Sequence, residues 1–265
     1  MKISLPYRSG LFLLWLLFKR DLRLRYAGAG LGTFWNFFHP ILLFGVYALV
    51  FGYFLKFRAR LLGREVDFLP YLFTGFWPWI AFNEGLLRCA YILFEYANII
   101  KRIRFPVAIL IPLGILGGLI PLIVGFSLLT LFLFLKGGLY FTPFKLFLFV
   151  IPLGLQLLWS FGLGFLVAAF TAYVRDLQQL LPSLLNLWFF LTPVIYSLEL
   201  VPPWLRDFLE ANPWNVILAW YRQLFLSSQI NWGLGEGWVL MAGIVIFYFG
   251  FWCFRRCSRH FADIL

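Results

Sequence analysis

Charged residues are scarce in this chain, and acidic ones are the scarcest. Only 12% of its 265 residues are charged, with 11 Asp and Glu against 22 Lys and Arg, whereas 63% are hydrophobic. Soluble domains contain about 25% charged residues, and a fold of this size could not keep so much apolar surface away from water. The composition therefore excludes a cytosolic enzyme and a disordered chain, and it predicts a protein of the lipid bilayer.

Cysteine frameworks and paired carboxylates are also lacking. The three cysteines, Cys89, Cys253 and Cys257, are too few for a disulfide framework. Cys253, Cys257 and His260 share one side of a helix, but no fourth ligand accompanies them, so we expect no metal and no cofactor. The aspartates are scattered singly and offer no pair for acid–base chemistry, so we expect no enzymatic activity.

Long stretches without Lys, Arg, Asp or Glu locate the predicted helices, because an α-helix needs about 20 apolar residues to cross a bilayer. These stretches do not alternate in polarity as the strands of a membrane β-barrel do. We predict an all-α integral membrane protein, with residues 1–265 forming a single domain of six transmembrane helices. The predicted spans are residues 33–56, 68–88, 106–135, 146–172, 177–198 and 237–255.

Two regions outside these spans are apolar but too short to cross. Residues 11–25 join eight apolar residues to a basic run, which predicts a helix lying along the cytoplasmic interface. Between the fifth and sixth spans, prolines suited to starting a helix predict two short helices, residues 203–210 and 213–226. We expect this pair to form a re-entrant or interfacial hairpin on the outer face.

The distribution of positive charge favours an N-terminus in the cytoplasm. With six spans in that orientation, the inner segments hold 14 Lys and Arg and the outer segments hold 8. Residues 1–10 show no cleavage site of a signal peptide, so we expect both termini to be cytoplasmic. Four basic residues between positions 56 and 64 lie in a predicted outer segment, against the rule that Lys and Arg are enriched on the cytoplasmic side. The net charge of +11 thus reflects membrane topology, and we expect no nucleic-acid partner.

The segment between the second and third spans, residues 88–105, reads RCAYILFEYANIIKRIRF. It is too charged to span a membrane and too apolar to be a solvated loop. One interpretation is an interfacial helix that extends its Lys and Arg into the lipid headgroups. The other is a helix that docks in a groove of a cytoplasmic partner through its Ile and Phe residues. Composition leaves both open.

Short motifs follow one another in a specific order through most of the chain. They are RDLRLRYAGAGLGTFWNFFHP at residues 20–40, Gly75 and Trp79, Asn98 to Lys101 with Phe105 and Pro106, Arg175 and Asp176, LTPVIY at residues 191–196, Asn212 and Pro213, and Tyr221 and Arg222. In this order and spacing the chain resembles the permease subunits of ABC-2 type polysaccharide exporters, which move lipid-linked O-antigen, capsule or teichoic acid chains.

The resemblance implies a homodimer of six-helix subunits with two separate ATP-binding cassette subunits in the cytoplasm. It implies export of a lipid-linked polysaccharide, with O-antigen favoured, to the outer face of the cell inner membrane. The chain has no Gly-rich phosphate loop, so ATP hydrolysis falls to the partner. The resemblance also places the interfacial helix and residues 91–104 against the ATPase. The residues expected to couple the two subunits are Phe94, Glu95, Asn98, Ile99 and Lys101.

Aromatic residues make up 22% of the chain. Most of them suit lipid-facing or helix-packing surfaces, or the belts at the two membrane interfaces. Sugars, however, present flat C–H faces that stack on rings, and an aromatic wall binds a sliding polymer weakly enough to release it. The resemblance implies that spans one and five face the dimer axis, where they would line the path of the polysaccharide. The candidate path residues are Trp35, Phe38, Phe44, Tyr47, Trp188, Phe189 and Tyr196.

A diphosphate-linked lipid needs cations where it enters the path. Arg20, Arg23 and Arg25 are the candidates, although anchoring by positive charge on the inner side explains the same residues. Glu84 is the one acid well inside a predicted span. A pair with Arg88, four residues later on the same helix face, accounts for it.

Other functions stay open at the level of sequence. An ion-gradient-driven carrier or channel would need several polar sites inside the membrane, but the sequence offers Glu84 alone and shows no inverted repeat. A membrane enzyme acting on polyprenyl lipids would need an acidic pair or a metal cluster. Among exporters, a teichoic acid permease is the alternative to an O-antigen permease.

Overall fold

The computed structural model of the protein describes residues 10–26, 34–102, 106–136, 143–228, 230, 233 and 236–265. Most of these residues are helical, as the sequence predicts. Within the described residues, three helical stretches are both long and apolar enough to cross a bilayer. They are Val107–Leu135, Phe144–Tyr173 and Gly237–Cys257. The chain is therefore a multi-pass membrane protein, and the count of six spans stays a prediction.

Helices follow one another along the chain, and a single short β-hairpin is described between the second and third of them. The α-helices are α1 (Gly10–Tyr26), α2 (Phe34–Tyr47), α3 (Phe68–Glu95), α4 (Ala97–Arg102), α5 (Leu110–Leu135), α6 (Pro143–Leu148), α7 (Val150–Tyr173), α8 (Leu177–Phe190), α9 (Pro203–Glu210), α10 (Pro213–Leu226), α11 (Gly237–Cys257) and α12 (Phe261–Ile264). A π-helical segment, Ala48–Phe54, continues α2, and the strands are β1 (Ala59–Leu61) and β2 (Arg64–Val66).

The central helix of the bundle is α3, which packs against α5, α7, α8 and α10. Glycines on α5 let the two backbones approach closely. A Cβ atom at Gly118 would collide with the carbonyl oxygen of Ala81, and one at Gly125 would collide with the ring of Trp77. Small residues are typical of helix contacts in membranes, where lipid supplies no hydrophobic force between helices.

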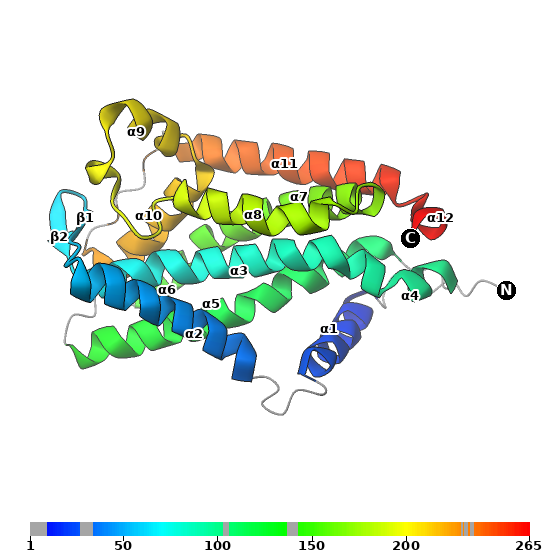
Figure 1. Cartoon of the computed structure of the whole chain (residues 1–265), viewed down its shortest axis with the longest axis horizontal. Helices are drawn as coiled ribbons and strands as arrows, with labels where there is room; N and C mark the ends of the chain where they lie inside the picture. The colour runs from blue at the N-terminus through cyan, green and yellow to red at the C-terminus, as the bar shows by residue number, and fades with distance from the viewer. Residues whose placement is uncertain are drawn as a thin grey trace.

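The two ends of the bundle differ (Figure 1). Helices α1, α4 and α12 lie toward one end, and α12 contacts α4. We call this the α4 end. The β-hairpin and α9 lie at the opposite end, which we call the hairpin end. Of the segments that the sequence assigns to the cytoplasmic side, residues 11–25 and 88–102 thus belong to the α4 end, and residues 103–105 lie outside the described residues.

Buried apolar side chains form two clusters. The larger one joins α3, α5, α7, α8 and α10 and is rich in aromatic rings. The smaller one lies at the α4 end, where Leu17 of α1, Ile92 of α3, Ile100 of α4 and Phe261 of α12 share a core. Helix α1 is therefore packed onto the bundle through Leu17, whereas Phe12, Trp15 and Leu16 of the same helix are exposed.

The sequence pattern does not predict the β-hairpin. Its two-residue turn consists of Leu62 and Gly63, with φ values of 52° and 73°. Two positive φ values are typical of the primed turns whose twist suits a two-residue hairpin, and glycine adopts them without steric strain. The basic residues between positions 56 and 64, which run against the charge rule, lie in and next to this hairpin.

Helix α8 ends at Phe190, whereas the predicted fifth span runs to residue 198. Pro193 explains the difference, because it lacks a backbone N–H and disfavours helical geometry at Thr192 before it. A helix of 14 residues is about 21 Å long, shorter than the roughly 30 Å core of a bilayer. Residues 191–197, which we call the α8 turn, continue the chain without forming an α-helix.

Helices α9 and α10 begin at the prolines, as predicted, and their ranges match the predicted residues 203–210 and 213–226. They differ in burial, because α9 exposes Trp204 and Phe208, whereas Trp214, Tyr221 and Arg222 of α10 are almost fully buried. Helix α10 contacts both α3 and α7. It therefore lies inside the protein, and its depth in the membrane stays a prediction.

Candidate functional site

The candidate path residues lie on α2, on α8 and in the α8 turn, and the structure brings two of them together. The ring centroids of Tyr47 and Phe189 are 5.7 Å apart, so α2 and α8 meet at this point. Phe44 packs on Phe73 of α3, with 4.3 Å between ring centroids. The backbone of Trp35 belongs to α2, but its side chain lies outside the described residues.

The other candidate path residues are partly buried within the subunit. Phe38 is half-buried on α2. Trp188 packs edge-on against Trp79 of α3, with 5.9 Å between ring centroids. The hydroxyl of Tyr196 donates to the carbonyl oxygen of Phe190 at 2.8 Å. Ring contacts link Phe44, Tyr47, Trp188 and Phe189 with Phe73 and Trp79 of α3, and Phe189 is only 6% exposed. The exposure of the candidate path residues to a polysaccharide stays a prediction.

The α8 turn is held by side chains of α3 and of the start of α10. The end of α8 leaves carbonyl groups without helical partners. Asn212 donates from Nδ2 to the carbonyl oxygen of Leu191 at 3.2 Å and to Oγ1 of Thr192 at 2.9 Å. Tyr71 of α3 donates its hydroxyl to the carbonyl oxygen of Tyr196 at 2.9 Å. Irregular backbone inside a membrane protein needs such internal partners.

Arg222 of α10 completes this arrangement. Its Nη2 donates to the carbonyl oxygens of Pro193 at 2.6 Å and Val194 at 3.0 Å. The guanidinium carbon lies 3.7 Å from the ring centroid of Tyr71, which is a cation–π contact. Gly75 has no side chain and so leaves room for Nη2 of Arg222, since a Cβ atom at position 75 would lie 2.8 Å from Nη2. Arginine suits this site, since its flat fork can both stack and donate twice.

The motifs that carry the family resemblance therefore meet in space. The LTPVIY stretch forms most of the α8 turn, and Gly75, Asn212 and Arg222 of three other motifs lie around it. Asn212 also caps α10, because its Oδ1 accepts from the backbone N–H of Trp214 at 3.1 Å. The same oxygen lies 3.4 Å from Nε1 of Trp188, which donates to it.

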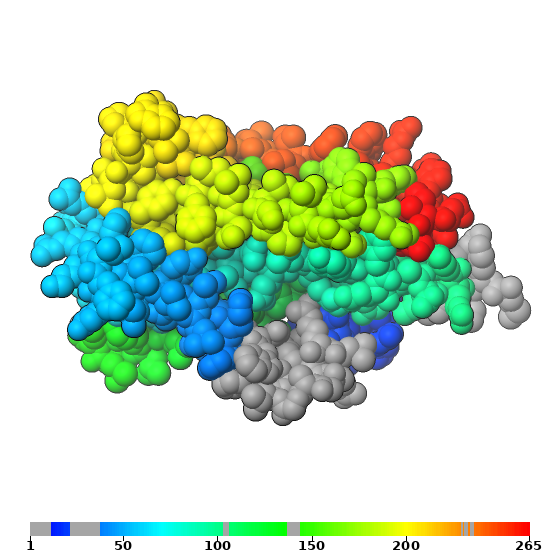
Figure 2. All heavy atoms as spheres, in the orientation of Figure 1, coloured from blue at the N-terminus to red at the C-terminus, as the bar shows by residue number. Residues whose placement is uncertain are grey.

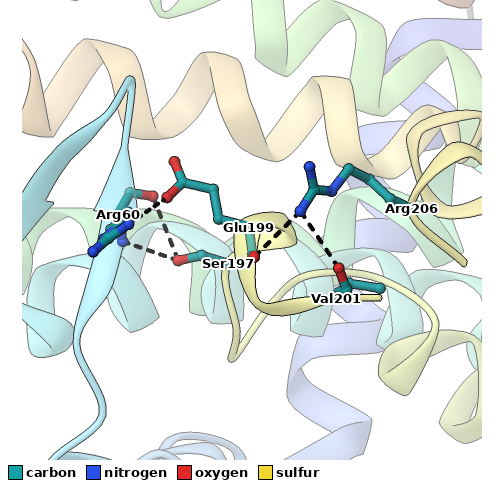
Figure 3. A network of polar contacts seen from close by, with 5 residues as sticks. All are labelled: Arg60, Ser197, Glu199, Val201 and Arg206. Atoms are coloured by element: carbon teal, nitrogen blue, oxygen red, sulfur yellow. Dashed lines mark hydrogen bonds and ion pairs between the residues drawn. The ribbon is translucent and has the colours of Figure 1, made fainter. Parts of the chain in front are cut away.

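A polar network ties the β-hairpin to the last residue of the α8 turn and to the segment that follows it (Figure 3). The backbone N–H of Arg60 donates to Oγ of Ser197 at 2.9 Å, and the Arg60 guanidinium pairs with Glu199 at 3.4 Å. Arg206 of α9 donates to the carbonyl oxygens of Glu199 and Val201 at 3.2 and 3.4 Å. The network joins the chain that follows α2 to the chain that follows α8.

At the α4 end, Arg88 of α3 bridges two carboxylates. It pairs with Asp21 of α1 and with Glu95, seven residues further along α3. Asp21 is only 3% exposed. A buried carboxylate is costly unless it is paired, so this contact fixes α1 against α3. The sequence predicts a pair between Arg88 and Glu84 and does not reveal Asp21.

Of the three arginines proposed to meet a lipid phosphate, Arg20 has a described side chain. Its guanidinium carbon lies 5.8 Å from the ring centroid of Tyr96, just beyond α3. Burial raises the pKa of Tyr96, and the Asp21 carboxylate raises it further, so its hydroxyl stays protonated. Arg23 and Arg25 belong to α1, but their side chains lie outside the described residues.

The predicted coupling residues lie at the end of α3 and in α4. Arg175, in the turn between α7 and α8, lies over the ring of Phe94, with 5.7 Å from its guanidinium carbon to the ring centroid. Ile99 packs against the buried cluster of the α4 end. Asn98 and Lys101 are exposed, as is Glu95, whose carboxylate pairs with Arg88. Partly buried apolar side chains thus lie beside exposed polar and charged ones at this end, and their contact with an ATPase stays a prediction.

Sequence reasoning assigned no structural role to Asp21, Tyr71, Gln156 and Arg222, although Asp21 and Arg222 belong to the motifs that carry the family resemblance. Gln156 of α7 is buried, accepts from the hydroxyl of Tyr221 at 2.8 Å and donates to the carbonyl oxygen of Pro78 at 3.2 Å. A lone polar residue in an apolar stretch was the available signal, because such a residue needs a partner on another helix. Within the described residues, no group of three or more His, Cys, Asp or Glu could hold a metal.

Long apolar helices packed around α3, with α1 packed at one end, define a helical multi-pass membrane protein. The family model described as ABC-2 type transporter matches residues 12–226 of this chain. The chain therefore belongs to the ABC-2 type transporter family, and the resemblance noted in its motifs is confirmed.

Named relatives cover most or all of the chain. The O-antigen export system permease protein RfbA of Klebsiella pneumoniae is 26% identical over 270 residues, which is 100% of both chains. The protein of the same name from Myxococcus xanthus is 28% identical over 217 residues, covering 81% of this chain and 80% of the relative. The polysialic acid transport protein KpsM of Escherichia coli is 23% identical over 245 residues, covering 90% and 91%.

Proposed function

We propose that this chain is the permease subunit of an ABC transporter that exports a lipid-linked polysaccharide, with O-antigen as the cargo, from the cytoplasm to the outer face of the inner membrane. The observation that carries the proposal is the match to an O-antigen export permease over the full length of both chains. Membership in the ABC-2 type transporter family supports transport as the activity.

Two separate ATP-binding subunits supply the energy in this proposal. The sequence contains no Gly-rich phosphate loop, which supports a division of labour between a permease and its ATPase. The α4 end is the surface proposed for the ATPase, because Phe94 and Ile99 offer apolar contacts there while Asn98 and Lys101 are exposed. The α4 end then faces the cytoplasm, together with both termini.

A second copy of the chain completes the transporter. Helices α2 and α8 both reach the molecular surface on the face seen in Figure 2. Large apolar side chains are exposed on both: Ile41, Leu42 and Val46 on α2, with Leu49 in the π-helical segment that continues it, and Leu180, Leu184, Leu187 and Phe190 on α8. Those of α8 follow helical spacing along one stripe. This pattern supports a homodimer that joins along α2 and α8.

The polysaccharide path in this proposal runs along the same two helices. The contact between Tyr47 and Phe189 supports it only by showing that α2 and α8 lie side by side, because Phe189 itself is packed in the core. Arg20, with Arg23 and Arg25 on the same helix, is proposed to bind the lipid diphosphate at the inner entrance. The side chain of Arg20 is exposed, which supports a role in binding phosphate.

The test is export by purified components. The chain reconstituted in vesicles with its ATPase subunit should translocate a labelled lipid-linked O-antigen when ATP is supplied to the ATPase. The matched control is the same complex with the phosphate-binding lysine of the ATPase replaced, which should be inactive. Translocation by this chain alone, or by an ion gradient without ATP, would contradict the proposal. Preferential translocation of a teichoic acid substrate would show that the cargo is teichoic acid and not O-antigen.

A further inference from the structure

Arg222 is an ionisable residue that the packing of α10 isolates from water. It is 3% exposed, and its Nε has no hydrogen-bond partner among the described residues. The hydrogen bonds that it makes are to backbone carbonyl oxygens of the α8 turn, and its flat face lies on the ring of Tyr71. A cation buried at such a cost is a candidate for function by default.

The neighbours of Arg222 show what the α8 turn is fastened to. Tyr221, the preceding residue, donates to Gln156 of α7 at 2.8 Å. Tyr71 of α3 both supports the guanidinium and donates to the carbonyl oxygen of Tyr196. The α8 turn is therefore held by α3 and α10, both part of the buried core, and its last residue, Ser197, is held by Arg60 of the β-hairpin.

We propose that Arg222 is a positioning residue for transport: it fixes the α8 turn to the core and so sets the place of Tyr196 at the outer end of the polysaccharide path. This inference rests on the proposed function. The turn follows directly on α8, where Trp188 and Phe189 are candidate path residues. Any displacement of Pro193 and Val194 would therefore move Tyr196 relative to those two rings.

The chemistry of the site favours arginine over other cations. Nη2 donates to two carbonyl oxygens while the guanidinium plane stacks on Tyr71. A lysine would bring a point charge without the flat face. Glutamine would keep one amide donor group but lose both the charge and the reach. We therefore expect Arg222→Lys to keep part of the attachment of the α8 turn to the core and Arg222→Gln to lose it.

The test measures the exposure of the turn directly. Ile195, beside Val194, is 5% exposed and becomes the reporter as Ile195→Cys in a chain whose three native cysteines are replaced. Arg222→Gln should raise the labelling rate of this cysteine by a membrane-impermeant maleimide about tenfold, because unpaired carbonyl groups loosen the turn. Arg206→Gln is the matched control, since Arg206 also donates to two carbonyl oxygens but lies on α9. It should leave the labelling unchanged.

A second variant guards against misfolding of Arg222→Gln. Gly75→Ala keeps the charge but places a Cβ atom 2.8 Å from Nη2 of Arg222 and 3.0 Å from the carbonyl oxygen of Val194. Gly75→Ala should therefore also raise the labelling rate of the reporter cysteine. Labelling that stays at the level of the parent in both variants would overturn the inference.

Export by the complete complex supplies the functional readout. Arg222→Gln should lower export about tenfold and leave ATP hydrolysis within about twofold, because the ATPase lies at the other end. Raised labelling with normal export would overturn the role of Arg222 in transport. If the parent complex exports no polysaccharide while the labelling difference persists, the proposed function fails and the fastening of the turn stands.

Discussion

Asp21 and Arg88, 67 positions apart in the sequence, form an ion pair that joins α1 to α3 at the α4 end. The side chain of Asp21 is 4% exposed and that of Arg88 is 19% exposed, so the pair is largely shielded from water. Leu17, one turn before Asp21, packs into the buried cluster of the same end. The helix that the sequence predicts at the membrane surface is thus attached to the bundle by both a polar and an apolar contact.

Replacing Arg88 with Ala should lower the free energy of unfolding by about 3 kcal/mol, because it removes the guanidinium from a buried carboxylate. The additional change Asp21→Asn should recover part of that loss, since no buried charge then remains at the pair. Thermal unfolding of the detergent-solubilised chain measures both. Glu95→Gln is the control and should cost below about 1 kcal/mol, because Glu95 is exposed. Equal losses for Arg88→Ala and Glu95→Gln would contradict the importance of burial.

Asn212 performs two tasks that substitution can separate. Ser at this position keeps an oxygen that can cap α10, whereas it loses the Nδ2 donor to Leu191 and Thr192. Asn212→Ser should therefore cost about 1–3 kcal/mol. Asn212→Ala loses the cap as well and should cost about 1 kcal/mol more. Unfolding of the two variants side by side gives the difference, and an Ala variant as stable as the Ser variant would show that the cap contributes nothing.

Gly118→Ala should destabilise the contact between α3 and α5. The added methyl group meets the carbonyl oxygen of Ala81 and lies 3.1 Å from the backbone nitrogen of Gly85, and neither atom can turn aside as a side chain would. We expect a loss of about 1–3 kcal/mol. Gly154→Ala is the matched control, because a Cβ atom there meets nothing within 4 Å. Thermal unfolding should separate the two, and equal stability would mean that α3 and α5 can move apart freely.

Arg20→Gln should raise the KM for a lipid-linked substrate about tenfold in an assay of substrate-stimulated ATP hydrolysis, because a charge-assisted bond to phosphate is lost. Lys19→Gln is the control on the same helix, where Lys19 lies over the ring of Trp15. Copurification of the ATPase subunit should be unchanged in both variants. Loss of copurification in Arg20→Gln would instead assign Arg20 to assembly and anchoring.

Local sequence signals were sufficient to predict where several helices begin or end. Helices α9 and α10 begin at Pro203 and Pro213, because proline at the first helical position fixes φ and needs no hydrogen-bond partner. Helix α5 ends at Leu135, as its apolar run predicts. Helix α3 continues to Glu95, beyond the predicted end of the second span at residue 88, because Arg88 and Glu95 pair on its surface and do not interrupt it.

Composition and hydropathy by themselves determined that this protein is helical and belongs in a membrane, and the order of its motifs determined its family. These properties depend on residue type and on short spacings along the chain, which the sequence states directly. Tertiary structure alone decided that Asp21 meets Arg88 and that Arg222 meets the α8 turn. Those contacts join residues on different helices, and the packing of small residues between α3 and α5, with the burial of α10, determines which polar groups are close enough to bond.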